Sequence, residues 1–157
     1  MMTAQALDRA LGEVERVLVD TSGLIAYHNP SESVHPLAKH LLGRIKDDGD
    51  PLRGYFSVMS ASEILIRPHR TGVSEFTFMY TFLTSFPNLT ALLMDMTVAT
   101  QAATIRSITG LRLPDAIVVA SGLLAGCQAI ITNDEKWKRK LEPLFRGFTW
   151  VYLGDCV

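Results

Sequence analysis

The chain has 157 residues, of which 48% are hydrophobic and 20% are charged, and its formal net charge is −1. This length allows one domain with a hydrophobic core, and the composition excludes a disordered chain. The charge is lower than that of a protein that grips nucleic acid by charge alone, although acidic metal ligands can hide a local basic rim.

Strands and helices are predicted to alternate along the chain. Residues 4–13 show the apolar spacing of a leading helix within the first 15 residues, and the run 16–20 is typical of a buried parallel strand. A helix is expected from Leu24, and another is expected to be capped by Ser60. Further helices are predicted at 34–46, 74–86, 97–108, 114–124 and 137–141. Further strands are predicted at 55–59, 89–94, 128–132 and 148–153.

This order indicates an α/β fold, with a central, mostly parallel sheet flanked by helices on both faces. We find no repeat and no linker, so residues 1–157 are expected to form a single domain.

Other classes of protein fit the sequence poorly. The longest apolar stretch, 116–127, is shorter than the roughly twenty residues of a membrane span. The N-terminus lacks the pattern of a signal peptide, and Cys127 and Cys156 suit reduced thiols. The histidines lack zinc-ligand spacing. A cytoplasmic protein is therefore expected.

Four acidic residues lie where ligands bind in α/β sheets, beyond the carboxyl ends of the strands. Asp20 ends the first strand, Glu63 lies one turn into the helix after 55–59, Asp115 opens the helix after Pro114, and Asp134 follows the strand 128–132. Carboxylates about 5 Å apart repel by roughly 3 kcal/mol at an effective dielectric near 20, so such a cluster needs a cation. Oxygen ligands favour Mg²⁺ or Mn²⁺. The bound ion would orient and deprotonate a water for attack on a phosphodiester.

Each acid also has a purely structural interpretation. Asp20 and Asp134 can be turn formers, and Asp115 can be a first-turn acid favoured by the helix dipole. Glu63 can be only the capping-box partner of Ser60. Asp95 is expected to lead into a helix and no more. The order and setting of the four acids together favour a site.

Four segments carry a resemblance to a known family: VLVDTSGLIAY, SASEIL, LRLPDAIVVASGLLAG and AIITNDEKW. Over roughly 17–153 the sequence resembles the PIN-domain family, especially the VapC-type toxin ribonucleases of toxin–antitoxin pairs. The leading helix is longer than in many members of the family, and the chain is less basic than an RNA-cutting enzyme suggests.

The resemblance implies a Mg²⁺- or Mn²⁺-dependent endoribonuclease. It implies that Asp20 and Asp115 are direct metal ligands and that Glu63 and Asp134 complete the site. The polar residues that orient ligands or water would be Thr21, Ser22, Thr132 and Asn133. The expected partners are RNA, an antitoxin protein and a second copy of the chain in a homodimer.

Two phosphotransfer classes and one binding class compete with this interpretation. A haloacid-dehalogenase-type phosphatase needs an acid where Ser22 stands, and a receiver-type domain needs an acidic pair after its first strand. A PIN-like domain that only binds nucleic acid or protein remains an alternative, as does cleavage of DNA instead of RNA.

Two further features predict contacts. A basic run follows Asp134 and is predicted either to bind RNA phosphates or to be a solvated helix face: Lys136, Lys138, Arg139 and Lys140. The helix 74–86 has two apolar stripes. Phe76, Met79, Tyr80 and Leu83 form the first stripe. Phe78, Phe82 and Phe86 form the second, which is expected to line an interface unless the helix is buried in the core.

Overall fold

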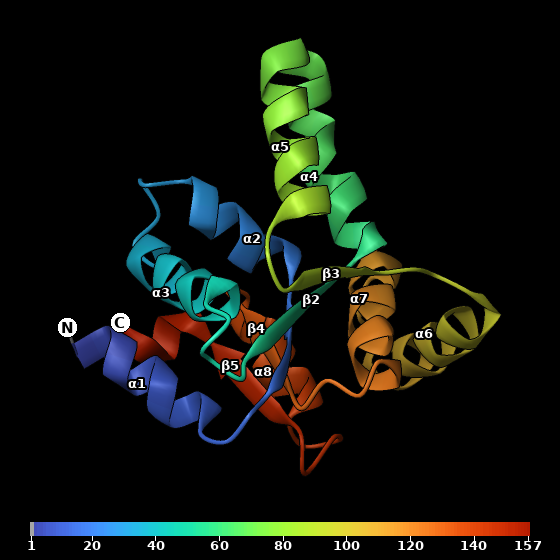
Figure 1. Ribbon diagram of the computed structural model, residues 1–157. Helices are drawn as coiled ribbons and strands as arrows, with labels where there is room; N and C mark the ends of the chain where they lie inside the picture. The colour runs from blue at the N-terminus through green and yellow to red at the C-terminus, as the bar shows by residue number, and fades with distance from the viewer. Residues whose placement is uncertain (1) are drawn as a thin grey trace.

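The structure is a computed structural model that describes residues 2–157, apart from the side chains of residues 2, 3, 69 and 71. Its strands form one parallel sheet in the order β3-β2-β1-β4-β5, with helices on both faces (Figure 1). The strands are β1 (Arg16–Val19), β2 (Arg53–Ser57), β3 (Leu89–Leu92), β4 (Ala129–Thr132) and β5 (Thr149–Tyr152). The predicted α/β fold with a parallel central sheet is confirmed.

The helices before and after β2 come first in the chain. They are α1 (Met2–Leu11), α2 (Thr21–His28), α3 (His35–Lys46), α4 (Val58–Thr71) and α5 (Val73–Ser85). The later helices are α6 (Met96–Thr109), α7 (Leu113–Leu124), α8 (Glu135–Leu141) and the short 3₁₀ helix η1 (Leu153–Cys156). None of the helices in the described part of the chain is long and apolar enough to span a bilayer.

The strands are buried on both faces because their apolar residues follow one another without polar interruption. Val17 and Val19 of β1 face one core, which α1, α2, α3 and the base of the α4–α5 hairpin complete. Leu18, between them, faces the second core, which α6, α7 and α8 complete. This alternation is the two-residue period of a strand, and it places the helices in two layers.

Two helices begin earlier than predicted. Helix α2 begins at Thr21 and not near Leu24, because the Asp20 side chain accepts a hydrogen bond from the Gly23 backbone nitrogen and caps the turn. Helix α4 begins at Val58, and Ser57 is its cap, so the predicted cap at Ser60 is wrong. The other elements differ from the predicted bounds by a few residues at each end, as helix and strand termini commonly do.

Helices α4 and α5 form a hairpin that projects from the body of the molecule (Figure 1). The predicted division of α5 into a core stripe and an interface stripe is wrong. The side chains of Phe82 and Leu83, one from each stripe, are buried, whereas those of Phe78 and Tyr80, also one from each, are 63% and 53% exposed. Burial in α5 therefore does not follow the two predicted stripes.

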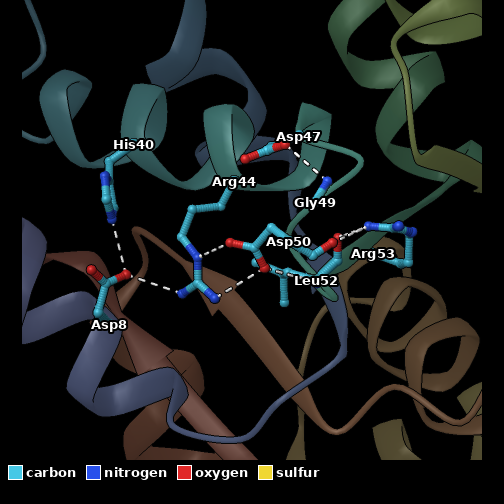
Figure 2. A network of polar contacts seen from close by, with 8 residues as sticks. All are labelled: Asp8, His40, Arg44, Asp47, Gly49, Asp50, Leu52 and Arg53. Carbon is cyan, nitrogen blue, oxygen red and sulfur yellow. Dashed lines mark hydrogen bonds and ion pairs between the residues drawn. The ribbon is translucent and has the colours of Figure 1, made fainter.

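The leading helix is held by apolar and ionic contacts. Leu7 and Leu11 are buried in the first core. Asp8 accepts hydrogen bonds from His40 and Arg44 of α3, and Arg44 also donates to Asp50, in the loop before β2 (Figure 2). The network joins α1, α3 and the entry to β2.

Candidate active site

The strand order places an opening at the carboxyl ends of β1 and β4. Strand β2, the next strand in the chain, pairs with one side of β1, and β4 pairs with the other side of β1. At such a switch point the following connections diverge, and ligands of α/β proteins bind in the resulting crevice. Asp20 directly follows β1 and Asp134 follows β4 by two residues, so both lie at this edge.

Asp20 is buried and fully held by its neighbours, with 3% of its surface exposed. Its Oδ1 accepts hydrogen bonds from the Ser22 hydroxyl at 2.7 Å and from the Gly23 backbone nitrogen at 2.9 Å. Its Oδ2 accepts a hydrogen bond from the Thr132 hydroxyl at 2.7 Å. These contacts from α2 and β4 fix the carboxylate in one orientation.

The electrostatic setting of Asp20 is unusual for a helix cap. Burial raises its pKa to about 6, against the opposing effect of the hydrogen bonds from Ser22, Thr132 and Gly23. The negative charge of Asp115 raises this pKa further, so the two carboxylates interact although they are 95 positions apart in sequence. Perturbed acids of this kind cluster at functional sites.

Asp134 joins the same network through β4. The Thr132 hydroxyl, which donates to Asp20, also accepts a hydrogen bond from the Asp134 backbone nitrogen at 3.0 Å. The Ser22 hydroxyl makes a second bridge, since it donates to Asp20 and accepts from the Asn133 backbone nitrogen at 2.8 Å. The ends of β1 and β4 are thus linked through side chains that the sequence singled out. The Asp134 carboxylate also caps α8.

Glu63 reaches this edge from α4. Its Oε1 accepts a hydrogen bond from the Thr21 hydroxyl at 3.2 Å, which joins it to the residue after Asp20. Because α4 begins at Val58, Glu63 is not the third residue of the helix and cannot complete a capping box with Ser60. That structural explanation of Glu63 is excluded.

Asp115 lies in the first turn of α7 and pairs with Arg112, a residue that the sequence reasoning missed. The Arg112 Nε lies 3.3 Å from Asp115 Oδ2. The pKa of Arg112 is raised first by this hydrogen bond and by the charge of Asp115, and also by the charges of Glu63 and Asp134. Arg112 therefore lies in the field of three of the four acids. The sequence signal that could have identified Arg112 is an arginine three positions before an acid at the start of a helix.

The four acids do not form one compact set of ligands. Among the described residues, no group of three or more His, Cys, Asp or Glu side chains is arranged to hold a metal ion. The arrangement is a buried carboxylate, Asp20, that interacts electrostatically with Asp115. The Thr132 hydroxyl links Asp20 to the Asp134 backbone nitrogen, and Glu63 accepts from Thr21, the residue after Asp20. A four-acid metal site stays a prediction.

A pocket of about 410 Å³ opens beside these acids, between the start of α7 and α8. It is lined by Gly110, Leu111, Arg112, Asp115, Asp134, Lys136, Trp137 and Lys140. Of the basic run predicted to bind RNA, Lys136 and Lys140 line this pocket. Lys138 instead donates to Asp155 of η1 at 2.6 Å, and Arg139 is exposed outside the pocket.

Comparison with known proteins gave one family match. The sequence pattern of the PIN domain matches residues 17–141, which leaves α1 and β5 outside the matched segment. No curated protein matches the sequence.

Several solved structures have a similar fold. A chain of a toxin–antitoxin complex from Klebsiella pneumoniae is 19% identical, with a TM-score of 0.64 over 87% of this chain and 97% of that chain. A chain of VapBC2 from Rickettsia felis, bound to a DNA fragment from its promoter, is 11% identical, with a TM-score of 0.63 over 87% and 98%. VapC20 from Mycobacterium tuberculosis, described as a toxin that cleaves the sarcin–ricin loop, is 21% identical, with a TM-score of 0.55 over 73% and 86%. At these identities the likeness shows the fold.

Proposed function

The chain belongs to the PIN-domain family, and we propose that it is a divalent-metal-dependent endoribonuclease, the toxin of a toxin–antitoxin pair. The observation that carries the proposal is the buried Asp20 carboxylate at the switch point of the sheet, with its pKa raised by burial and by Asp115. A helix cap alone needs neither burial nor a second carboxylate, whereas a cation site benefits from both.

The residues at this edge suit Mg²⁺ or Mn²⁺. The available donors are carboxylate and hydroxyl oxygens, the ligands that these hard cations prefer. Magnesium takes one or two carboxylates directly and keeps several waters. Asp20 and Asp115 would hold the ion directly, and Glu63 and Asp134 would complete the site through water. The ion would supply positive charge that activates a water and offsets the charge that develops on the phosphodiester.

The neighbouring residues prepare this site. Oδ1 of Asp20 accepts hydrogen bonds from Ser22 and Gly23, whereas Oδ2 accepts one from Thr132, so Oδ2 keeps a lone pair for a cation. Thr21 holds Glu63 at the same edge, and Asn133 donates its backbone nitrogen to Ser22. Such outer contacts orient metal-binding carboxylates and strengthen metal binding.

A partner protein fits a second surface. An apolar groove of about 1040 Å³ lies between α2 and α5 and includes Tyr27, His28, Phe78 and Phe82. In the part of the chain that the structure describes, the buried His28 Nε2 has no hydrogen-bond partner. One of the solved structures with a similar fold is a toxin–antitoxin complex, from Klebsiella pneumoniae. We assign the groove to a helix of an antitoxin, and a homodimer remains a second use of the exposed part of α5.

The test compares cleavage of a single-stranded RNA and a DNA of the same sequence in Mg²⁺, in Mn²⁺ and in EDTA. Wild-type protein should cleave RNA only with metal. Asp20→Asn and Asp115→Asn should each lower the rate about 100-fold or more, since several kcal/mol of charge stabilisation is lost. Asp95→Asn is the matched control, because Asp95 caps α6 by accepting from Val98 but lies on an exposed surface.

Retained activity in Asp20→Asn or Asp115→Asn would contradict the site. Binding of RNA by the wild type without cleavage in either metal would instead support the alternative, a PIN-like module that only binds. Preferential cleavage of DNA would show that the substrate is DNA and not RNA, and it would leave the site assignment intact.

A further inference from the structure

The pocket beside the acidic site combines two acids with three cations. Asp115 and Asp134 are in its wall, and Arg112, Lys136 and Lys140 surround it. Lys136 and Lys140 are four residues apart in α8, so they lie on one face of this helix. Trp137 and Leu141 are buried in the second core and hold that face toward the pocket. Cations next to a carboxylate pair suit a ligand that carries negative charge.

The structure divides the basic run of α8 into residues that face the pocket and residues that do not. Lys138 is occupied, because its ammonium group lies 2.6 Å from Asp155, and this contact raises its pKa. Arg139 is exposed and lies outside the pocket. Within residues 2–157, no ion pair involves Lys136 or Lys140. These two ammonium groups are available to a ligand.

Arg112 is held by charge and not by packing. Its side chain is 76% exposed, and its nitrogens lie 3.3 Å and 3.5 Å from the Asp115 oxygens, longer than a strong charged hydrogen bond. An exposed pair of this kind contributes little stability. The guanidinium can therefore exchange partners at small cost, and its planar donors match a phosphate as well as a carboxylate.

We propose that this pocket is the phosphate subsite of the enzyme. In this subsite Arg112, Lys136 and Lys140 bind the RNA backbone, and Arg112 moves from Asp115 to a phosphate when RNA enters. The inference rests on the proposed function and deepens it. Trp137 is buried, so the pocket offers no exposed aromatic ring for base stacking. Its contacts are therefore with phosphates, and they are independent of base sequence. A local rim of three cations also explains how a chain of net charge −1 can bind a polyanion.

The first test measures binding of a fluorescein-labelled single-stranded RNA in EDTA, at a series of KCl concentrations. Arg112→Gln, Lys136→Gln and Lys140→Gln should each weaken binding several-fold. The slope of log affinity against log salt is negative, and each variant should make it less steep by about 0.7 for every phosphate that the variant no longer neutralises. Arg139→Gln removes the same charge from the same helix and should change neither quantity. Equal affinities and slopes for the pocket variants and Arg139→Gln would overturn the proposal.

The second test isolates the exchange of partners by Arg112. Calorimetric titration with Mn²⁺ in the absence of RNA should show tighter binding to Arg112→Gln than to wild type, because a cation that competes for Asp115 is gone. Arg139→Gln should bind Mn²⁺ as the wild type does. Unchanged or weaker Mn²⁺ binding by Arg112→Gln would refute the exchange.

The two proposals fail separately. If the wild type cleaves no RNA with either metal, the nuclease assignment fails, and the salt slopes still decide the phosphate subsite. If the wild type cleaves RNA while Arg112→Gln, Lys136→Gln and Lys140→Gln bind it normally, only the subsite is wrong.

Discussion

Two acidic residues of the site, Asp20 and Asp134, are also helix caps, a role that Asp95 outside the site shares. Asp20, Asp95 and Asp134 all cap helices by accepting from a backbone nitrogen two or three residues later. Asp20 is buried, and the charge of Asp115 contributes to raising its pKa, while Asp95 is exposed. At this scale a cap and a ligand differ in surroundings and not in local geometry.

Gly23 shows how closely the site depends on packing. A Cβ at this position would lie 2.9 Å from Val19 Cγ1, a buried branched side chain that cannot rotate away. We expect Gly23→Ala to destabilise the protein by about 1–3 kcal/mol, since overpacking a core costs that much.

Gly43 provides the control for this substitution. It lies within α3, and a Cβ there would meet nothing within 4 Å. Gly43→Ala should stabilise the protein by about 0.5–1 kcal/mol, because it removes backbone entropy from the unfolded chain. Urea denaturation in EDTA measures both variants, and a neutral or stabilising Gly23→Ala would contradict the packing argument.

At the scale of elements, the α4–α5 hairpin divides into a packed base and a projecting end. Tyr27 of α2 stacks on Phe82 with ring centroids 5.4 Å apart, and His28 meets Phe82 edge-on at 4.3 Å. Phe78, one turn away, contacts His28 at 5.7 Å but stays largely exposed. The same helix therefore contributes to the core and to the groove assigned to a partner.

This division predicts that alanine substitutions at Phe82 and Phe78 have very different effects on stability. Phe82→Ala should destabilise the fold by about 3–5 kcal/mol, the usual cost of removing a buried phenylalanine. Phe78→Ala should change stability by less than about 0.5 kcal/mol, because its side chain is 63% exposed.

The association measurement for Phe78→Ala uses sedimentation for self-association and co-purification with the product of any small reading frame that adjoins the gene. Weaker association with unchanged stability supports the assignment of the groove. Unchanged association in both assays would remove Phe78 from any interface, and a large loss of stability would mean that Phe78 belongs to the core.

On the scale of the whole molecule, α1 lies outside the segment that matches the family, yet it completes the first core. Its buried leucines pack beside α3 and η1, which brings the two ends of the chain close together (Figure 1). Arg44 adds a polar link, since it donates to Asp8 and Asp50 at once (Figure 2). The guanidinium holds the pKa of Asp50 below its ordinary value.

This network predicts how stability depends on pH. A carboxyl with a lowered folded pKa stabilises the protein above its unfolded pKa, about 3.9, and this contribution disappears as the pH falls through the folded pKa. Asp50→Asn should therefore cost about 2 kcal/mol at pH 7, the worth of hydrogen bonds to a charged group, and less as the pH falls below about 3.9.

Asp47→Asn is the control for the pH experiment, because the Asp47 side chain is exposed and accepts from the Gly49 backbone nitrogen, not from a charged group. Its stability should stay within about 0.5 kcal/mol of the wild type at both pH values. A difference between Asp50→Asn and wild type that is as large at pH 3 as at pH 7 would show that the Arg44–Asp50 charge pair is not its cause.

Much of the fold could be predicted from the sequence, because the signals that define it are local. The compact apolar run of 16–20 and the 3.6-residue period of the helices identify the elements, and their alternation implies the parallel sheet. The same order places Asp20 and Asp134 after strands. The predicted start of α4 is wrong because Ser57 and Ser60 are equally good caps in sequence, and only the end of β2 decides between them.

Only the tertiary structure decided which side chains meet. The sequence contains Arg112, Lys136, Lys138 and Lys140 as equivalent cations, but the fold brings Asp155 to Lys138 and leaves the others around the pocket. The sequence likewise shows two apolar stripes on α5, and the projection of the hairpin determines that Phe82 is buried and Phe78 is not. Periodicity is a property of neighbours in the chain, whereas burial and charge pairing depend on elements that are distant in sequence and adjacent in space.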